Sequence, residues 1–370
     1  MPHTDLPGRI RSLDAYSPGL SIDEIRQKYN LPVVIKMASN ENPLGCSPLV
    51  QQVIARRAPY AFRYPQSGNP RLCEALAERH KIDKAKIAIG NGSDEIIDLL
   101  MRILCEPRKH SIACFEPCFS IYPIQAQING LETRRCALKS DFSFDFDKLL
   151  EKIDGSTRLC FVTTPDNPSG YCPEPEKVAE FAQKLSVRAP ECLLVIDEAY
   201  MDFAPNAGTT SLLESGKLPA NAAVLRTFSK SYGLAGLRIG YGILPDDLAS
   251  YYWRARLPFS LNILAEEAAI AALEDYAFRE ATIKIVREGR KFLATGLARI
   301  GCHVWPSAAN FLMFKLPKNS ISAAECFEKL LAKGIIIRKL ASYNLPDKLR
   351  VSIGNTSENL AFIEAMEAIL

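Results

Sequence analysis

This 370-residue chain has few histidines, few tryptophans and almost no charge imbalance. Its four histidines lie far apart in sequence, without the spacing of a metal site. The 45 basic and 42 acidic side chains leave a formal net charge of +3, with no basic block, so nucleic-acid binding has little support. No apolar run approaches the roughly 20 residues of a membrane-spanning helix, and the first residues do not resemble a secretory signal. We therefore expect no metal, nucleic-acid or membrane partner.

Cysteine is the exception among the scarce residue types, with eleven copies. The number is odd, no Cys-x-x-Cys pair occurs, and several cysteines lie inside apolar runs, as Cys160 and Cys192 do. Free buried thiols in a reducing compartment account for this pattern better than disulfides. The sequence thus predicts a cytoplasmic protein.

The length favours two domains, and the apolar pattern changes near residue 263. Before it, short continuous apolar runs alternate with amphipathic helical stretches, which is typical of an α/β domain with a largely parallel sheet covered on both faces. The runs lie at 86–89, 111–115, 158–162, 192–196, 222–225 and 239–243.

The later part of the sequence predicts long helices up to residue 300, shorter strands at 310–314, 335–337 and 349–353, and a last helix with Ser357 as its N-cap. We expect a large domain over 37–265 with a mostly parallel mixed sheet, and a smaller α+β domain over 266–370. Residues 1–36 read as an N-terminal arm with a short helix at 21–26.

A glycine-rich turn at 90–95, Gly-Asn-Gly-Ser-Asp-Glu, follows one strand and opens a helix. Ser93 is a natural N-cap, and the free amides of a first helical turn can bind a phosphate. An ordinary capped helix explains the turn equally well. The dinucleotide-binding fingerprint is incomplete, because Glu95 replaces its third glycine.

Three further strands are each followed by candidate ligands. Phe119 could be a core aromatic or a stacking face. Asn167 lies in a rigid proline-rich turn at the edge of the sheet where α/β proteins bind ligands. Asp197 could cap a helix or pair with a cationic ring nitrogen, and Tyr200 could donate to the same ligand. Each residue alone favours the structural role.

The segment 226–238 is the most informative part of the sequence. Lys230 follows the apolar run 222–225, and Arg238 follows it across a glycine-rich turn. This arrangement suits an amine that bonds to a carbonyl cofactor while its neighbours bind a phosphate. A single lysine is more often a solvated surface residue.

The order of these motifs, from the phosphate turn to the lysine and arginine, resembles the aspartate-aminotransferase superfamily of pyridoxal-phosphate enzymes, known as fold type I. The resemblance extends over nearly the whole chain. Closer matches resemble the histidinol-phosphate aminotransferase family, and they lie at residues 14–19, 38–45, 62–65, 90–95, 197–203, 307–311, 334–338 and 349–354.

The resemblance implies the cofactor pyridoxal 5'-phosphate and a role for each motif residue. Lys230 forms the Schiff base and carries protons, Asp197 keeps the pyridine nitrogen protonated, and Tyr200 tunes the site with Asn167. Phe119 stacks on the ring. The phosphate ligands implied are Ser93, Asp94, Ser229 and Arg238, with Tyr64 reaching the phosphate of the neighbouring subunit in a homodimer with shared active sites.

The substrate side implied by the resemblance consists of Tyr16, Asn40, Arg338 and Arg350. The reaction is transamination of L-histidinol phosphate with 2-oxoglutarate, giving imidazole acetol phosphate and L-glutamate in histidine biosynthesis. The chain departs from the family pattern at three positions. Asp166 and Ser169 stand where Asn and Thr are commoner, and Cys118 stands in place of Thr.

Two enzymes of the same fold remain as alternatives, a threonine-phosphate decarboxylase and a broad aromatic amino-acid aminotransferase. The decarboxylases tend to read Asn-Ile-Asn-Pro where this chain has Asn-Glu-Asn-Pro at 40–43. A cofactor-binding regulator would carry a DNA-binding domain, for which we expect no residues here. The presence of Lys230, Asp197 and Arg238 disfavours an inactive structural protein.

Overall fold

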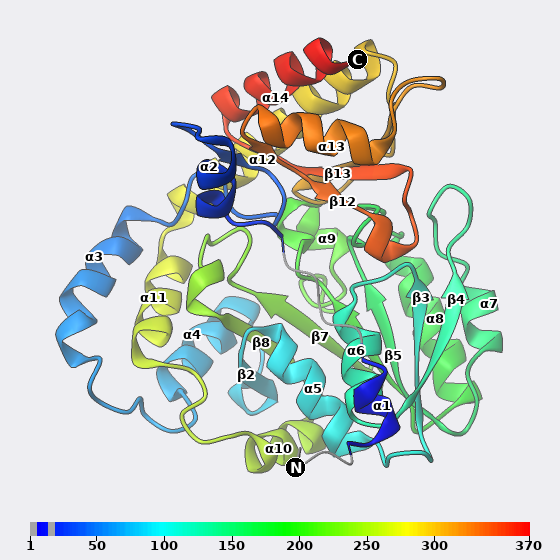
Figure 1. The fold of residues 1–370 in the computed structure, drawn as a ribbon. Coiled ribbons are helices and arrows are strands. Elements are labelled where there is room, and N and C mark those ends of the chain that lie inside the picture. The colour runs from blue at the N-terminus through cyan, green and yellow to red at the C-terminus, as the bar shows by residue number, and fades with distance from the viewer. Residues whose placement is uncertain (1–5, 14–18) are drawn as a thin grey trace, which may run out of the picture.

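The computed structural model describes residues 6–13 and 19–370. Its centre is a seven-stranded sheet in the order β2-β8-β7-β6-β5-β3-β4 (Figure 1). β8 is antiparallel to both neighbours and the other pairs are parallel, which confirms the predicted α/β class with a mostly parallel mixed sheet. The strands are β2 (Ile87–Asn91), β3 (Ser111–Glu116), β4 (Glu132–Ala137), β5 (Thr157–Thr163), β6 (Leu193–Asp197), β7 (Ala222–Thr227) and β8 (Ile239–Ile243).

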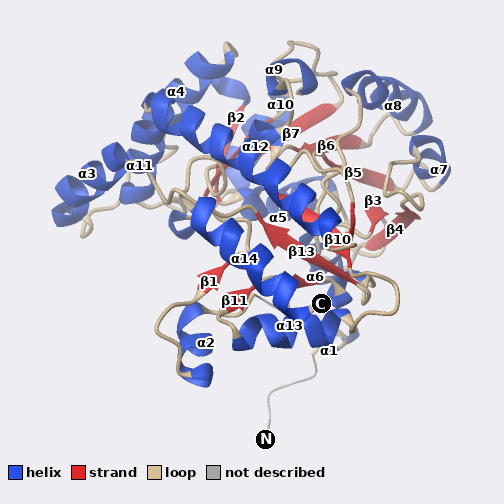
Figure 2. Ribbon diagram, turned by 90° about the horizontal axis from the view of Figure 1, so that it is seen from above, coloured by secondary structure: helices blue, strands red, loops and turns tan. Residues whose placement is uncertain are grey.

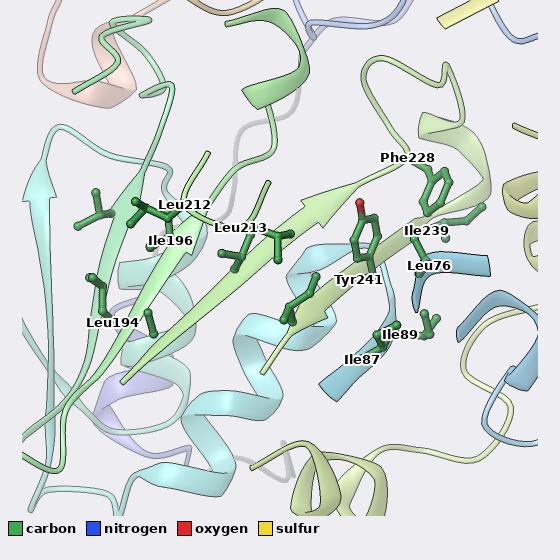
Figure 3. Packing of buried hydrophobic residues seen from close by; sticks show 14 of the residues in the cluster. Leu76, Ile87, Ile89, Leu194, Ile196, Leu212, Leu213, Phe228, Ile239 and Tyr241 are labelled. Carbon is green, nitrogen blue, oxygen red and sulfur yellow. The ribbon is translucent and has the colours of Figure 1, made fainter. Parts of the chain in front are cut away.

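Helices cover both faces of this sheet, which is why its inner strands are apolar along their whole length. One face packs on α5 (Ser93–Leu104), α6 (Ile121–Ile128) and α10 (Asp246–Ala255). The other packs on α3 (Pro48–Arg57), α4 (Pro70–His80), α7 (Phe146–Glu151), α8 (Pro175–Arg188) and α11 (Ile263–Glu274). Figure 3 shows this second layer, where Leu76 lies near Ile89 and Tyr241.

A second, antiparallel sheet has the order β12-β13-β10-β9, and it lies above the central sheet in the view of Figure 1. Its strands are β9 (His303–Val304), β10 (Phe311–Lys315), β12 (Arg338–Lys339) and β13 (Lys348–Ser352). Three helices surround it, α12 (Tyr276–Arg299), α13 (Ala323–Ala332) and α14 (Thr356–Ile369), with α12 and α14 side by side (Figure 2).

The remaining elements connect these two parts. β1 (Ile35–Lys36) pairs with β11 (Ile335–Ile336), so the end of the predicted arm is tied to the C-terminal part of the chain. The short helices are α1 (Gly8–Arg11), α2 (Ile22–Tyr29) and α9 (Ala207–Thr210), and the 3-10 turns are η1 (Ala58–Tyr60), η2 (Lys84–Lys86), η3 (Met201–Phe203), η4 (Ala235–Leu237) and η5 (Ala341–Tyr343).

Two predicted helix caps are wrong. α14 begins after Asn355, which accepts from the Glu358 amide in a reciprocal capping box, whereas Ser357 donates to the Asn355 side chain. α5 has Gly92 at its N-cap, and Ser93 is its first helical residue. Within residues 6–13 and 19–370, no helix is both long and apolar enough to cross a membrane.

Candidate active site

Nine of the residues singled out in the sequence line one small cavity of about 140 Å³. The cavity lies where β5, β6 and β7 end, because parallel strands direct their carboxyl ends to one edge of the sheet. The nine residues are Ser93, Asp94, Phe119, Asn167, Asp197, Tyr200, Ser229, Lys230 and Arg238.

The amine of Lys230 lies in this cavity and donates to the carbonyl oxygen of Ser39 at 3.2 Å. Burial and, after it, the nearby Arg350 lower the pKa of Lys230 to about 8; Arg238 acts in the same direction, and Glu41 and Asp94 oppose it. A lysine with a depressed pKa supplies the neutral amine that attack on a carbonyl requires.

An anion-binding cradle lies at the first turn of α5. Gly92 has a φ of 75°, and a Cβ there would lie 2.5 Å from Nη2 of Arg238. That guanidinium reaches Asp94 Oδ2 at 3.0 Å and Ser229 Oγ at 3.5 Å. Free amides at a helix N-terminus beside an arginine and two hydroxyl-bearing residues, Ser93 and Ser229, fit a phosphate group.

Asp197 provides a buried carboxylate on the same cavity wall. The Tyr122 hydroxyl donates to its Oδ2 at 2.6 Å, and the Ala199 amide donates to its Oδ1 at 3.1 Å. Burial raises the pKa of Asp197 to about 6, and both hydrogen bonds oppose that rise. The carboxyl is therefore held as an acceptor that can pair with a protonated ring nitrogen.

Tyr122 is a site residue that the sequence did not reveal. Tyr122 is fully buried between Asp197 and Thr163, and its hydroxyl oxygen lies 2.8 Å from Oγ1 of Thr163. The only available signal was its place three residues after Phe119 at the start of a helix. A buried tyrosine there fits an ordinary core position equally well.

Two of the predicted substrate residues, Asn40 and Arg350, contact residues that line the lysine cavity. Asn40 Nδ2 donates to the Tyr200 hydroxyl at 3.1 Å. Arg350 Nη1 donates to Asn167 Oδ1 at 2.5 Å, and its Nη2 donates to the Ala38 carbonyl at 2.9 Å. The structure thus brings Asn40 and Arg350 to residues of the lysine cavity.

The other predicted residues lie elsewhere. Arg338 pairs directly with Arg350 across β12 and β13, yet it lines a neighbouring hollow of about 440 Å³ together with Cys118 and Ser120. Tyr64 is 81% exposed and stacks on Phe259 with ring centroids 4.8 Å apart, outside the cavity of its own chain. Tyr16 lies outside the described residues.

The chain matches the family model "Aminotransferase class I and II" over residues 32–367. It is 55% identical to the histidinol-phosphate aminotransferase of Nitratidesulfovibrio vulgaris strain Hildenborough, over 99% of this chain and 96% of that one. It is 40% identical to the histidinol-phosphate aminotransferase of Shouchella clausii, over 98% and 96% of the two chains.

Among solved structures, the chain is similar to the histidinol-phosphate aminotransferase of Sinorhizobium meliloti in complex with pyridoxal-5'-phosphate. The TM-score is 0.87 at 26% identity, with 99% of each chain covered. These matches confirm the resemblance inferred from the motifs.

Proposed function

We propose, because the chain belongs to the histidinol-phosphate aminotransferase family within the class I and II aminotransferases, that it transfers the amino group of L-histidinol phosphate to 2-oxoglutarate. The products are imidazole acetol phosphate and L-glutamate. The enzyme is an aminotransferase with pyridoxal 5'-phosphate as its cofactor.

The observation that carries the substrate proposal is the direct pairing of Arg338 with Arg350 on neighbouring antiparallel strands. Directly opposed residues project from the same face of a sheet. Two guanidinium groups at this position suit a substrate with a phosphate ester, and they also suit the two carboxylates of glutamate. The buried Arg350 contacts Asn167 in the wall of the lysine cavity, and Arg338 lines the neighbouring hollow.

The cofactor supplies an aldehyde and a conjugated ring that withdraws the electron pair left when a proton is removed from substrate carbon. The Lys230 amine takes that proton from the carbon bearing the amino group, since it lies in the cavity with a pKa near 8. Asp197 keeps its negative charge against the ring nitrogen, and Tyr122 holds that carboxylate in place.

The remaining cavity residues orient the reactants. Phe119 lies in the cavity wall as a flat face for the ring. Arg238, Ser229 and the first turn of α5, with Ser93 and Asp94, hold the phosphate. Tyr200 and Asn167 would offer polar groups to the ring oxygen, and each is held by a second residue, Asn40 for Tyr200 and Arg350 for Asn167.

Cofactor capture by the cofactor-free protein should depend on pH. With a pKa of about 8, roughly a tenth of the Lys230 amine is neutral at pH 7, compared with fewer than about one in a thousand for an ordinary lysine. Raising the pH removes the proton, so we expect the rate of covalent capture to rise about tenfold per unit up to pH 7 and to level off above pH 8. Stopped-flow absorbance checks this; a rise continuing past pH 10 contradicts it.

Single half-reactions test the choice of substrate. The yellow enzyme is mixed with histidinol phosphate, phenylalanine or threonine phosphate, and the visible band of the bound cofactor is followed. We expect histidinol phosphate to bleach the band at the lowest concentration. No response to histidinol phosphate overturns the proposal, and carbon dioxide release from threonine phosphate favours the decarboxylase alternative.

Replacing Arg338 by alanine should selectively weaken the binding of histidinol phosphate. Loss of a charged hydrogen bond of about 1.5–3 kcal/mol corresponds to an increase in KM of about 10- to 150-fold. The KM for phenylalanine, which carries no phosphate, should change little. Lys339→Ala is the matched control, because Lys339 is the next residue on the strand, is exposed and points to the opposite face. Equal changes for both substrates contradict a phosphate role.

We also propose a cytoplasmic homodimer with shared active sites. The eleven free cysteines support a reducing compartment. Exposed apolar side chains gather near one another in the loops after η1 and α10, and they include Phe62, Tyr64, Leu257 and Phe259. A second copy would cover them and place Tyr64 at the neighbouring phosphate. Sedimentation equilibrium should give twice the chain mass of 41.0 kDa; a monomer contradicts the dimer.

A further inference from the structure

The segment 197–203 contains an acidic residue, Asp202, to which the proposed reaction assigns no role. It lies in η3, immediately beyond the cavity residues Asp197 and Tyr200. Its carboxylate is nevertheless in contact with the residue that follows the lysine, since Ser231 Oγ donates to Asp202 Oδ2 at 2.5 Å. Asp202 therefore contacts the residue next in sequence to Lys230.

The other oxygen of Asp202 contacts a different part of the protein. Arg279, in the first turn of α12, donates from Nη2 to Asp202 Oδ1 at 2.7 Å. One carboxylate therefore holds the residue after Lys230 with one oxygen and the start of α12 with the other. Burial alone would raise the pKa of Asp202, but Arg279 and then Arg226 hold it well below its usual range.

A second route joins the same two segments. Asn42 Nδ2 donates to the carbonyl oxygen of Ser231 at 2.9 Å and lies 3.2 Å from the hydroxyl of Thr282, one turn further along α12. The loop carrying Lys230 is therefore attached to α12 through both a side chain and a backbone carbonyl of Ser231.

α12 is well placed to transmit a displacement. Its later turns supply Val286, Leu293 and Leu297 to the apolar core around the C-terminal sheet. Arg290, in the same helix, donates to the carbonyls of Phe203 and Ala309 at 3.2 and 2.7 Å. The helix thus packs beside α14 in the C-terminal part of the chain (Figure 2). Its first turns contact Asp202 in η3 and Asn42, and both of these residues contact Ser231.

On the side of the central sheet, Asp202 lies in a cluster of acidic side chains around Arg226. Arg226, at the end of β7, contacts Glu198 at 2.6 Å and lies 3.5 Å from Asp202 and 3.6 Å from Glu214. Asp202 is therefore one of three carboxylates beside Arg226, and Glu198 lies closest, so charge balance at Arg226 does not depend on Asp202 alone.

We propose that Asp202 is a positioning residue that ties the loop carrying Lys230 to helix α12, so that the docking of α12 sets the place of the lysine amine. This inference rests on the proposed aminotransferase chemistry. It concerns how the amine is held and does not depend on which amino donor is used.

The test removes each end of the connection separately. Ser231→Ala breaks the contact to the lysine loop and leaves the Asp202–Arg279 ion pair intact. Arg279→Gln breaks the contact to α12. Ser156→Ala is the matched control, because Ser156 is a half-buried serine that donates to a carboxylate, Asp154 Oδ1 at 2.8 Å, and it lies at the opposite end of β5 from the cavity.

The first measurement is the pH titration of the visible band of the bound cofactor in the holoenzyme, which needs no substrate. Arg350 and Arg238 favour the unprotonated form of the lysine nitrogen. A loosened lysine lies further from these cations, so we expect the titration midpoint to rise by at least about half a pH unit in Ser231→Ala and Arg279→Gln. The midpoint of Ser156→Ala should stay at the wild-type value.

The second measurement is a kinetic cycle with the active amino donor. Small displacements of a reacting group lower kcat, so we expect about a tenfold loss in either single variant with KM within about twofold. If Asp202 couples Ser231 to Arg279, the kcat of the double variant Ser231→Ala/Arg279→Gln should be no lower than that of the slower single variant. A lower melting temperature with an unchanged titration midpoint, or strictly multiplicative kinetic losses, overturns the proposal.

Discussion

Replacing Lys230 by alanine is expected to eliminate the visible band of the bound cofactor and to lower kcat by at least about 10⁴-fold. The lysine has two roles in the proposed reaction, as the covalent anchor and as the group that moves the proton. No second lysine lines the cavity among the residues that the structure describes, so no neighbouring amine can substitute. The measurements are the absorbance spectrum of the purified variant and the rate of a single half-reaction.

Lys230→Arg is the informative companion to the alanine variant. It keeps the positive charge and most of the side-chain length, but its guanidinium stays protonated and cannot supply a neutral amine. Both variants should therefore lose the band, while their melting temperatures without cofactor stay close to that of the wild type. If the visible band of the bound cofactor persists in either variant, an amine other than Lys230 holds the cofactor.

The sequence predicted the central sheet well because its inner strands are continuous apolar runs. The exception is β4, which was not predicted. Its sequence from Glu132 to Ala137 is largely polar, and only Cys136 is buried, because the strand lies at the edge of the sheet. An edge strand with one covered side carries too little hydrophobic pattern to distinguish it from a loop.

The cavity residues could be predicted because each follows an apolar strand, and parallel strands bring their ends together. Residues that act through another side chain had no such signal. Asp202 and Ser231 contact only in the folded chain, 29 residues apart in sequence. The contact of Arg350 with Asn167, across 183 residues, likewise depends on how the two sheets are packed together. The roles of all these residues remain proposals.

Asp197→Asn is expected to lower kcat by about 10²–10³-fold, the usual loss when one preorganised charge beside the reacting system is removed. The amide keeps the size and one acceptor of the carboxylate but cannot stabilise a protonated ring nitrogen. Cofactor should still be captured, because Lys230 and the anion cradle remain. Absorbance and kcat measured on the same sample separate binding from turnover, and an unchanged kcat contradicts the role of Asp197.

Tyr122→Phe shows whether that carboxylate depends on its hydrogen bond. The variant removes only the donor at 2.6 Å, which opposes the rise caused by burial, so the pKa of Asp197 should move above about 6. A smaller fraction of the carboxylate is then ionised at neutral pH, and the acid limb of the kcat profile should shift to higher pH. Activity is regained as the pH is raised in Tyr122→Phe, whereas it is not regained in Asp197→Asn, which has no carboxyl group to ionise. This difference separates an electrostatic role of Tyr122 from a purely structural one, since a packing defect would lower kcat equally at every pH.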